Sequence, residues 1–120
     1  METRLIMESN ANGELYVAII LYESWSSDPS FKSMFEECFV LIRADSDEQA
    51  LARAEQLSKD KETCYDNVAG QDVRWKLKRI VDVSRVLSDT MDDGAELYAR
   101  HFANYDAYYA FEPLLGGTLD

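Results

Sequence analysis

The stretch from Leu15 to Tyr22 most constrains the fold, because every position in it carries an apolar or aromatic side chain. Successive side chains of a β-strand point to opposite faces of the sheet, so a strand over these residues presents apolar groups on both faces. Such strands are covered on both sides. We therefore predict that this strand is central in its sheet. The stretch is too short to cross a bilayer as a helix, which takes about 20 residues.

A hairpin and a helix are expected next. Turn-forming residues crowd positions 24–30, and a second apolar run spans 35–44, which predicts a β-hairpin with a long loop. Ser46 followed by Gln49 fits a capping box, so a helix is predicted over about 46–61. Ala50, Ala54 and Leu57 lie at helical spacing and predict the face that packs on the sheet.

A long strand is predicted from Val73 to Leu87, after a turn-rich connection at 64–72 that has room for one short strand. Its first residues alternate between apolar and basic side chains. The alternation breaks after Lys78, which predicts a β-bulge near Arg79 or Ile80. Residues 96–102 fit either a final strand or a short helix, and the strand is favoured.

The C-terminal segment is aromatic. Tyr105, Tyr108 and Tyr109 share one face at helical spacing, so a short amphipathic helix is expected, packing either on the core of its own domain or on a partner. The predicted organisation is a polar leader (1–13), a single α+β domain (14–103) and an aromatic tail (104–120). The fold class is an antiparallel sheet of four or five strands, with one main helix packed on one face and a tail that completes the core.

The order of these segments resembles a known family. Phe35-Glu36-Glu37 precedes the run from Val40 to Ala44, a helix built on Ala50 and Ala54 follows, and Val73-Arg74-Trp75-Lys76 and the segment Asp93–Arg100 come later. Together they resemble DUF4288, a small bacterial domain of unknown function, over about residues 15–102. The resemblance implies a small α+β domain in bacteria, and it implies no catalytic residue.

Charge is distributed unevenly along the chain, whose formal net charge is −11. Residues 1–72 carry fifteen acids and six bases, residues 73–86 carry one acid and five bases, and residues 87–120 carry seven acids and one base. Opposite potentials on different surfaces steer the choice of partner more than they determine the fold. The sequence therefore points to an acidic protein with one basic strand.

The pattern of reactive residues does not indicate an enzyme. His101 is the single histidine, and no Ser, Cys or carboxylate is placed beside it by any motif. Cys38 and Cys64 form no C-x-x-C pair, and no metal-ligand spacing is present. Glu36 and Glu37 point to opposite faces of a strand. We predict no catalytic, cofactor-binding or metal-binding residue, reduced and buried thiols, and a cytoplasmic protein without a secretory signal.

The basic stripe Arg74, Lys76 and Lys78 has two interpretations. It is suited to a phosphate backbone, but Trp75 points to the other face, and the net charge of −11 repels nucleic acid. The alternative is that the bases pair across strands with Glu36 and other acids. Nucleic acid is therefore not the expected partner, and the role of the stripe stays open.

Four acids form the candidate binding site: Asp89, Asp92, Asp93 and Glu96. Such a patch binds a cation, caps a helix or meets a basic protein surface. The function predicted is a non-enzymatic acidic protein-binding module, in its most specific form an immunity-type inhibitor of a basic toxin. The alternatives are a small-ligand-binding protein with a pocket lined by Trp25, Trp75 and Tyr98, or a structural homo-oligomer joined by sheet edges or aromatic tails. A basic protein partner is expected, and homodimerisation is left open.

Overall fold

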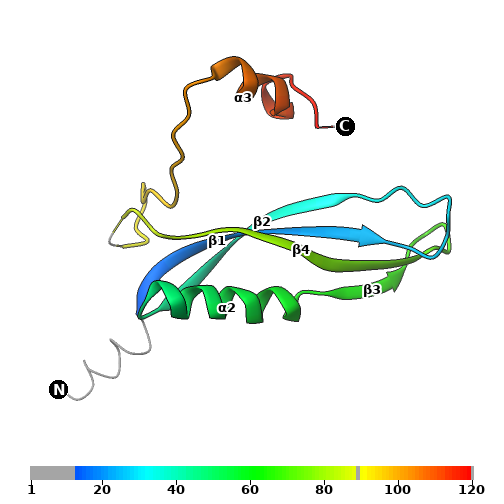
Figure 1. Ribbon diagram of the computed structural model, residues 1–120, viewed down its shortest axis with the longest axis horizontal. Coiled ribbons are helices and arrows are strands. Elements are labelled where there is room, and N and C mark those ends of the chain that lie inside the picture. The colour runs from blue at the N-terminus through cyan, green and yellow to red at the C-terminus, as the bar shows by residue number, and fades with distance from the viewer. Residues whose placement is uncertain (1–12, 89, 120) are drawn as a thin grey trace.

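The computed structural model describes residues 13–88 and 90–119. Its body is a four-stranded antiparallel sheet in the order β2-β1-β4-β3, with helix α2 across one face (Figure 1). In chain order the elements are β1 (Glu14–Trp25), β2 (Phe35–Ala44), α2 (Asp47–Asp60), β3 (Thr63–Asp66), β4 (Asp72–Arg85), α3 (Tyr105–Phe111) and the 3₁₀ turn η1 (Pro113–Leu115). This is the predicted α+β class, with four strands.

The strand β1 is central, as predicted, because it pairs with β2 on one side and β4 on the other. Its side chains alternate between the face that α2 covers, here called the helix face, and the opposite outer face. Ala18 and Ile20 are buried on the helix face, while Val17 and Ile19 are buried on the outer face. Burial on both sides explains why residues 15–22 of this strand are all apolar or aromatic.

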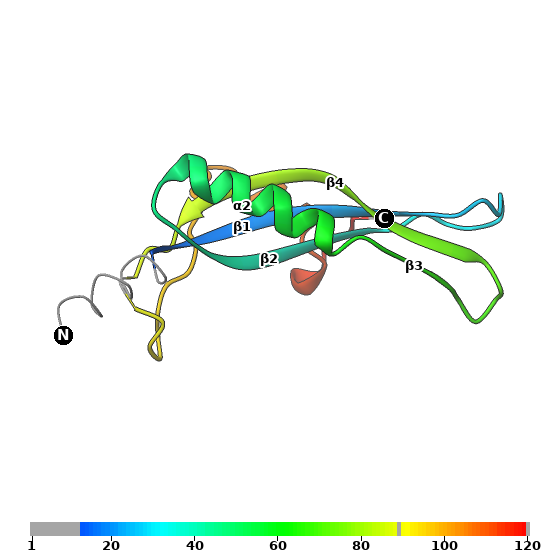
Figure 2. The same ribbon diagram turned by 90° about the horizontal axis from the view of Figure 1, so that it is seen from below.

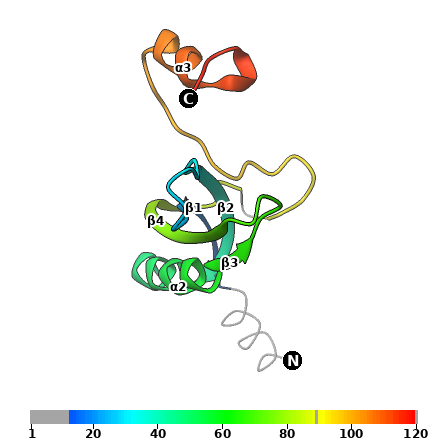
Figure 3. The same ribbon diagram turned by 90° about the vertical axis from the view of Figure 1, so that its right-hand side faces the viewer.

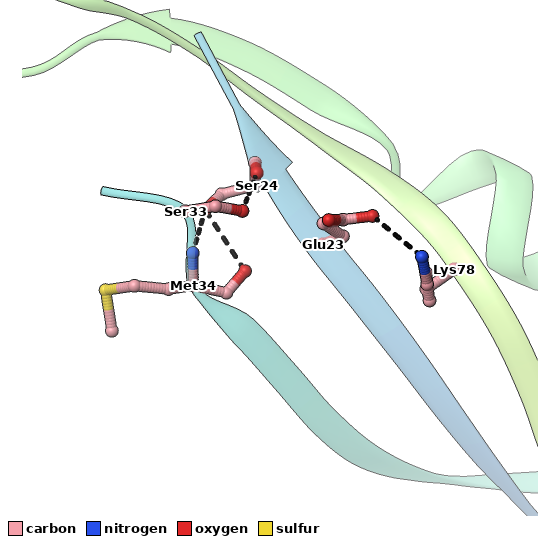
Figure 4. A network of polar contacts seen from close by, with 5 residues as sticks. All are labelled: Glu23, Ser24, Ser33, Met34 and Lys78. Carbon is pink, nitrogen blue, oxygen red and sulfur yellow. Dashed lines mark hydrogen bonds and ion pairs between the residues drawn. The ribbon is translucent and has the colours of Figure 1, made fainter. Parts of the chain in front are cut away.

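The β1–β2 hairpin is closed by Ser24 at the mouth of its loop (Figure 4). The Ser24 amide donates to the Met34 carbonyl over 2.9 Å, and the Met34 amide donates to the Ser24 hydroxyl oxygen over 2.7 Å. The Ser33 hydroxyl donates to the Ser24 carbonyl. These bonds satisfy the polar groups of the buried Ser24, so the long loop begins from a fixed stem.

Helix α2 begins at the predicted cap, since the Ser46 hydroxyl oxygen accepts from the Gln49 amide. Ala50, Ala54 and Ser58 are its fully buried residues, while Leu57 is only half-buried. Their four-residue spacing keeps these small side chains on one face, which lets the helix lie close to the sheet. The buried Ser58 extends the predicted stripe by one turn.

Two tyrosines of β1 hold the two ends of α2. The Tyr16 hydroxyl donates to the Asp47 carboxylate over 3.1 Å, and the Tyr22 hydroxyl donates to the Ser58 carbonyl over 2.9 Å. Both rings are buried in the core. Burial is the main cause that raises the pKa of each hydroxyl above its ordinary value.

Two bulges interrupt β4, where the sequence predicts one. Ile19 and Ile20 of β1 oppose Asp82 and Ile80, so Val81 is an extra residue, and a second shift between Leu21 and Tyr22 leaves Lys78 extra. The two extra residues flank the predicted position at Arg79 or Ile80. Each bulge explains one break in the alternation.

The predicted strand over 96–102 is wrong, because these residues form neither strand nor helix. Tyr98 fixes the segment on the outer face instead. Its hydroxyl donates to the Asp82 carboxylate over 2.9 Å, and its ring lies edge-on to Phe39 at 6.3 Å between centroids. Tyr98 thus contacts β4 through Asp82 and β2 through Phe39, and both are side-chain contacts with no strand pairing.

The aromatic tail forms the expected short helix, but it does not complete the core, so that prediction is wrong. No residue of α3 or η1 is buried, and α3 lies on the outer-face side, apart from the sheet (Figures 2 and 3). Its rings pack on each other, with Phe102 stacked on Tyr108 at 4.8 Å. The radius of gyration is 18.4 Å, against about 14 Å for a compact chain of this length.

The close packing of α2 gives a first prediction. Ala54→Leu inserts three carbons where no space exists, so we expect a loss of about 1–3 kcal/mol in the free energy of unfolding. Urea denaturation measures this. Ala52→Leu, on the exposed side of the same helix, is the matched control and should change stability by less than about 0.5 kcal/mol. Equal effects at both positions would contradict the packing described.

The Tyr98–Asp82 bond gives a second prediction. The Ser84 hydroxyl and the Tyr98 hydroxyl both donate to Asp82 and hold the pKa of that carboxyl below its ordinary value. Tyr98→Phe should therefore lower the free energy of unfolding by about 1 kcal/mol at neutral pH.

The pH dependence follows from the sign of that shift. Because the pKa of Asp82 is lower in the folded state, the stabilisation is present above the unfolded pKa of about 4 and is lost as pH falls through the folded value. The gap between wild type and Tyr98→Phe should narrow on acidification in urea titrations at several pH values. Tyr105→Phe, whose ring is exposed, is the control without effect. A gap that widens in acid would refute this account.

Candidate functional site

The predicted acidic patch lies on the loop that follows β4. Asp92, Asp93 and Glu96 are all exposed there, while Asp89 lies outside the described residues. The loop is closed at its stem, because the Ser88 amide donates to the Glu96 carbonyl over 3.1 Å and the Glu96 amide donates to the Ser88 hydroxyl oxygen over 2.7 Å. The structure therefore brings three of the four predicted residues together on one loop.

The carboxylates of this loop are exposed and have no ion-pair partner among the described residues. No Lys or Arg within residues 13–88 and 90–119 forms an ion pair with Asp92, Asp93 or Glu96. The Asp92 carboxylate accepts from the Thr90 hydroxyl over 2.9 Å, and the Asp92 carbonyl accepts from the Ala95 amide. Gly94 permits the tight turn, since its φ is +88°. Within the described part of the chain, no ion pair offsets the negative charge of these three side chains.

A cleft of about 620 Å³ lies on the helix face just beyond the end of α2. It forms because the helix stops before the sheet does, which leaves the far part of the sheet uncovered. The Trp75 indole N–H donates to the Tyr65 hydroxyl over 3.2 Å and fixes two of its aromatic rings. The full lining is Tyr22, Glu36, Glu37, Cys38, Lys61, Thr63, Tyr65 and Trp75.

The thiol in this cleft is not activated as a nucleophile. Burial is the main cause that raises the pKa of Cys38, and Lys61 opposes it only in part. The thiol therefore stays protonated at neutral pH, whereas nucleophilic attack needs the thiolate. Both cysteines are free, as predicted, but Cys64 is exposed and Cys38 is only half-buried. The expected burial of Cys64 is wrong because β3 is an edge strand with all four residues exposed.

The predicted ligand pocket of Trp25, Trp75 and Tyr98 does not form. Only Trp75 lines the cleft. Trp25 lies on the outer face with the Arg74 guanidinium over its ring at 5.1 Å, and Tyr98 contacts Asp82 and Phe39. Sequence reasoning missed the cleft itself. The signal that was available is the early end of the helix, which stops at Asp60 while the sheet that it covers continues.

The basic stripe points away from Trp75, as predicted. Lys78 forms an ion pair with Glu23 at 3.3 Å (Figure 4), and the register places Lys76 opposite the same glutamate. Glu36 is opposite Tyr22 on the helix face, so the predicted pairing of the stripe with Glu36 is wrong. The acid across the strand is Glu23. The exposed pair contributes little to stability, at most about 1 kcal/mol.

Neither a metal site nor a membrane-spanning helix is present among the described residues. His101 is exposed. In the part of the chain that the structure describes, no group of three or more His, Cys, Asp or Glu side chains is arranged to hold a metal ion. Among the described helices, none has the length and apolar character needed to cross a membrane.

Comparison with known proteins identifies the family. Residues 15–99 match the family described as a domain of unknown function, DUF4288. No curated protein and no solved structure matches the chain. The match covers more than half of the chain and contains β1, β2, α2, β3 and β4, together with the acidic loop up to Ala99. The chain therefore belongs to the DUF4288 family.

Proposed function

We propose that this protein is a non-enzymatic binding module whose acidic loop meets a basic surface of a protein partner. The observation that supports it is the loop carrying Asp92, Asp93 and Glu96, three exposed carboxylates that form no ion pair with any described residue. A charged patch that is not neutralised within its own chain speeds association with an oppositely charged partner and selects against other partners. Asp89, three residues before Asp92 in the sequence, is the fourth acid of the proposed site.

The loop is constrained at two points, which favours binding. Its stem is bonded between Ser88 and Glu96, and Tyr98 attaches the following residues to the sheet through Asp82. A loop held in one conformation loses little entropy when it is bound. The carboxylates are therefore presented on a fixed platform.

The most specific form of the proposal is an immunity-type inhibitor that covers a basic toxin in the bacterial cytoplasm. An inhibitor of this kind needs a shaped, charged surface and no catalytic group. A neutral Cys38 thiol and an exposed His101 fit that requirement. In this form, coexpression with the captured partner should relieve growth arrest caused by that partner.

The proposal predicts a basic partner in the native lysate. Tagged protein should retain a basic protein at low salt, in stoichiometric amount, and should release it as salt rises, because exposed charges are screened. The variant Asp92→Asn, Asp93→Asn, Glu96→Gln should weaken that capture by tenfold or more, as measured by titration with the purified partner.

The control keeps the same change in net charge elsewhere. Glu55→Gln, Asp60→Asn, Asp66→Asn neutralises three exposed acids of α2 and β3. This variant should bind almost as well as wild type. Equal weakening in both variants would mean that only the net charge matters, and an empty eluate at low salt would reject the proposed function.

A second candidate function, small-ligand binding, is favoured by the cleft beside Lys61. Its volume of about 620 Å³ suits a small molecule, and it combines aromatic walls with Glu36, Glu37 and Lys61. Structural homo-oligomerisation, the third candidate, would use an edge strand of the sheet.

Ligand binding predicts thermal stabilisation. A compound that binds only the folded state stabilises it by about 2.7 kcal/mol at one hundred times its Kd. A thermal-shift screen of metabolites should therefore raise the melting temperature, and Tyr65→Ala should remove that rise. Val68→Ala, at a fully exposed position, is the control that should keep it. A screen without any shift would remove this candidate.

A further inference from the structure

The strand β2 is an edge that lacks the usual protection against pairing. It is ten residues long, it has a neighbouring strand on one side only within the described sheet, and its register with β1 is unbroken. It contains no proline, no lysine and no bulge, three of the devices by which edges are blocked, and its charged residues are Glu36, Glu37 and Arg43. Phe35, Phe39 and Leu41 on its outer face are 56%, 60% and 45% exposed. Such an edge is a template for another strand.

The outer face of β2 is complementary to itself. The register with β1 places Glu37, Phe39, Leu41 and Arg43 on this face in sequence order. When the same four residues run antiparallel to a second copy, each acid meets a base and each apolar side chain meets another. Opposite charges and apolar pairs directly across a ladder both stabilise it. The partner that fits this edge is therefore a second copy of this chain.

We propose that two copies pair antiparallel along β2 about a two-fold axis at Val40. Glu37 then lies opposite Arg43 of the second copy, and Phe39 lies opposite Leu41 of the second copy. On the helix face Val40 meets its own counterpart. The two four-stranded sheets join into one continuous sheet, and the contact is isologous.

Alternative registers lose this match. Residues directly opposite in a ladder share a face. The axis must therefore pass between the two copies of one residue, and only the choice of that residue is free. An axis at Phe39 places Glu37 opposite Leu41, and an axis at Leu41 places Arg43 opposite Phe39. Only the axis at Val40 pairs both charges and both apolar side chains.

Arg43 already makes a contact within its own chain. A guanidinium carries five N–H donors in a planar fork, so it can hold an existing partner and a carboxylate of the second copy together. Glu37 and Arg43 of one chain lie six residues apart on one strand, a separation of about 20 Å. Any direct interaction between them must therefore join two chains.

Charge reversal tests the proposal on the full chain by sedimentation and light scattering. Wild type should be a dimer. Glu37→Arg and Arg43→Glu each place like charges opposite one another twice, which should weaken the dimer by roughly tenfold or more. The double variant Glu37→Arg, Arg43→Glu should restore it. Glu55→Arg and Lys59→Glu, on the exposed side of α2, are the controls that should leave the dimer intact.

Mixing the two single variants is the sharper measurement. In a mixed dimer both ion pairs re-form, so two samples that are monomeric alone should associate when combined. Circular dichroism of each variant checks that the fold is kept. A wild-type chain that stays monomeric at high concentration, or a mixture that fails to associate, would overturn the proposal.

Disulfide cross-linking tests which residues of the two β2 strands lie opposite each other. In a background with Cys38→Ser and Cys64→Ser, Val40→Cys should form a disulfide between two chains on oxidation, since the symmetric pair falls within the distance that a disulfide spans. Leu41→Cys should form far less. Efficient cross-linking at Leu41 in place of Val40 would refute the proposed axis.

Discussion

Burial of β1 on both faces is the constraint on which the rest of the structure depends. Its helix face requires α2, and the three small residues of that helix, Ala50, Ala54 and Ser58, allow the close approach. Its outer face requires a second cover, which the segment around Tyr98 supplies only in part. The sheet is therefore covered over most of one face and only in part on the other. The cleft lies on the covered face, beyond the end of α2, and the exposed apolar side chains of β2 lie on the other face.

Much of the fold could be predicted because its signals are local. Ser46 caps a helix through its own hydroxyl, and the run from 35 to 44 alternates as a strand does. Residues 96–102 could not be assigned this way. Their alternation matches a strand, but they are fixed by the hydrogen bond from the Tyr98 hydroxyl to the Asp82 carboxylate of β4. A single bond of this kind produces no periodic pattern in the sequence. The prediction that the tail completes the core failed for a similar reason. Rings that pack on each other have the same sequence pattern as rings that pack on a core.

Of the two candidate sites, the acidic loop could be predicted from the sequence and the cleft could not. The acidic loop was visible because its carboxylates lie close together in the chain, and the structure brings Asp92, Asp93 and Glu96 onto one loop. The cleft was not visible, because Cys38, Lys61 and Trp75 come from three separate elements and meet only where α2 ends early. Long-range proximity of this kind depends on where a helix stops relative to a sheet, which local propensity does not determine.

The two bulges of β4 have a consequence for how this strand tolerates change in length. At each bulge two residues of β4 oppose one residue of β1, so the positions that face the helix shift by one in the sequence beyond it. Two bulges cancel, so Val73 and Val83, on either side of them, both face the helix side. Because each extra residue is taken up inside its own bulge, deletion of Lys78 or Val81 would restore regular pairing with β1 at that point and leave the facing of both halves of the strand intact. Related chains should therefore gain or lose single residues at these two positions without exchanging the faces of the strand.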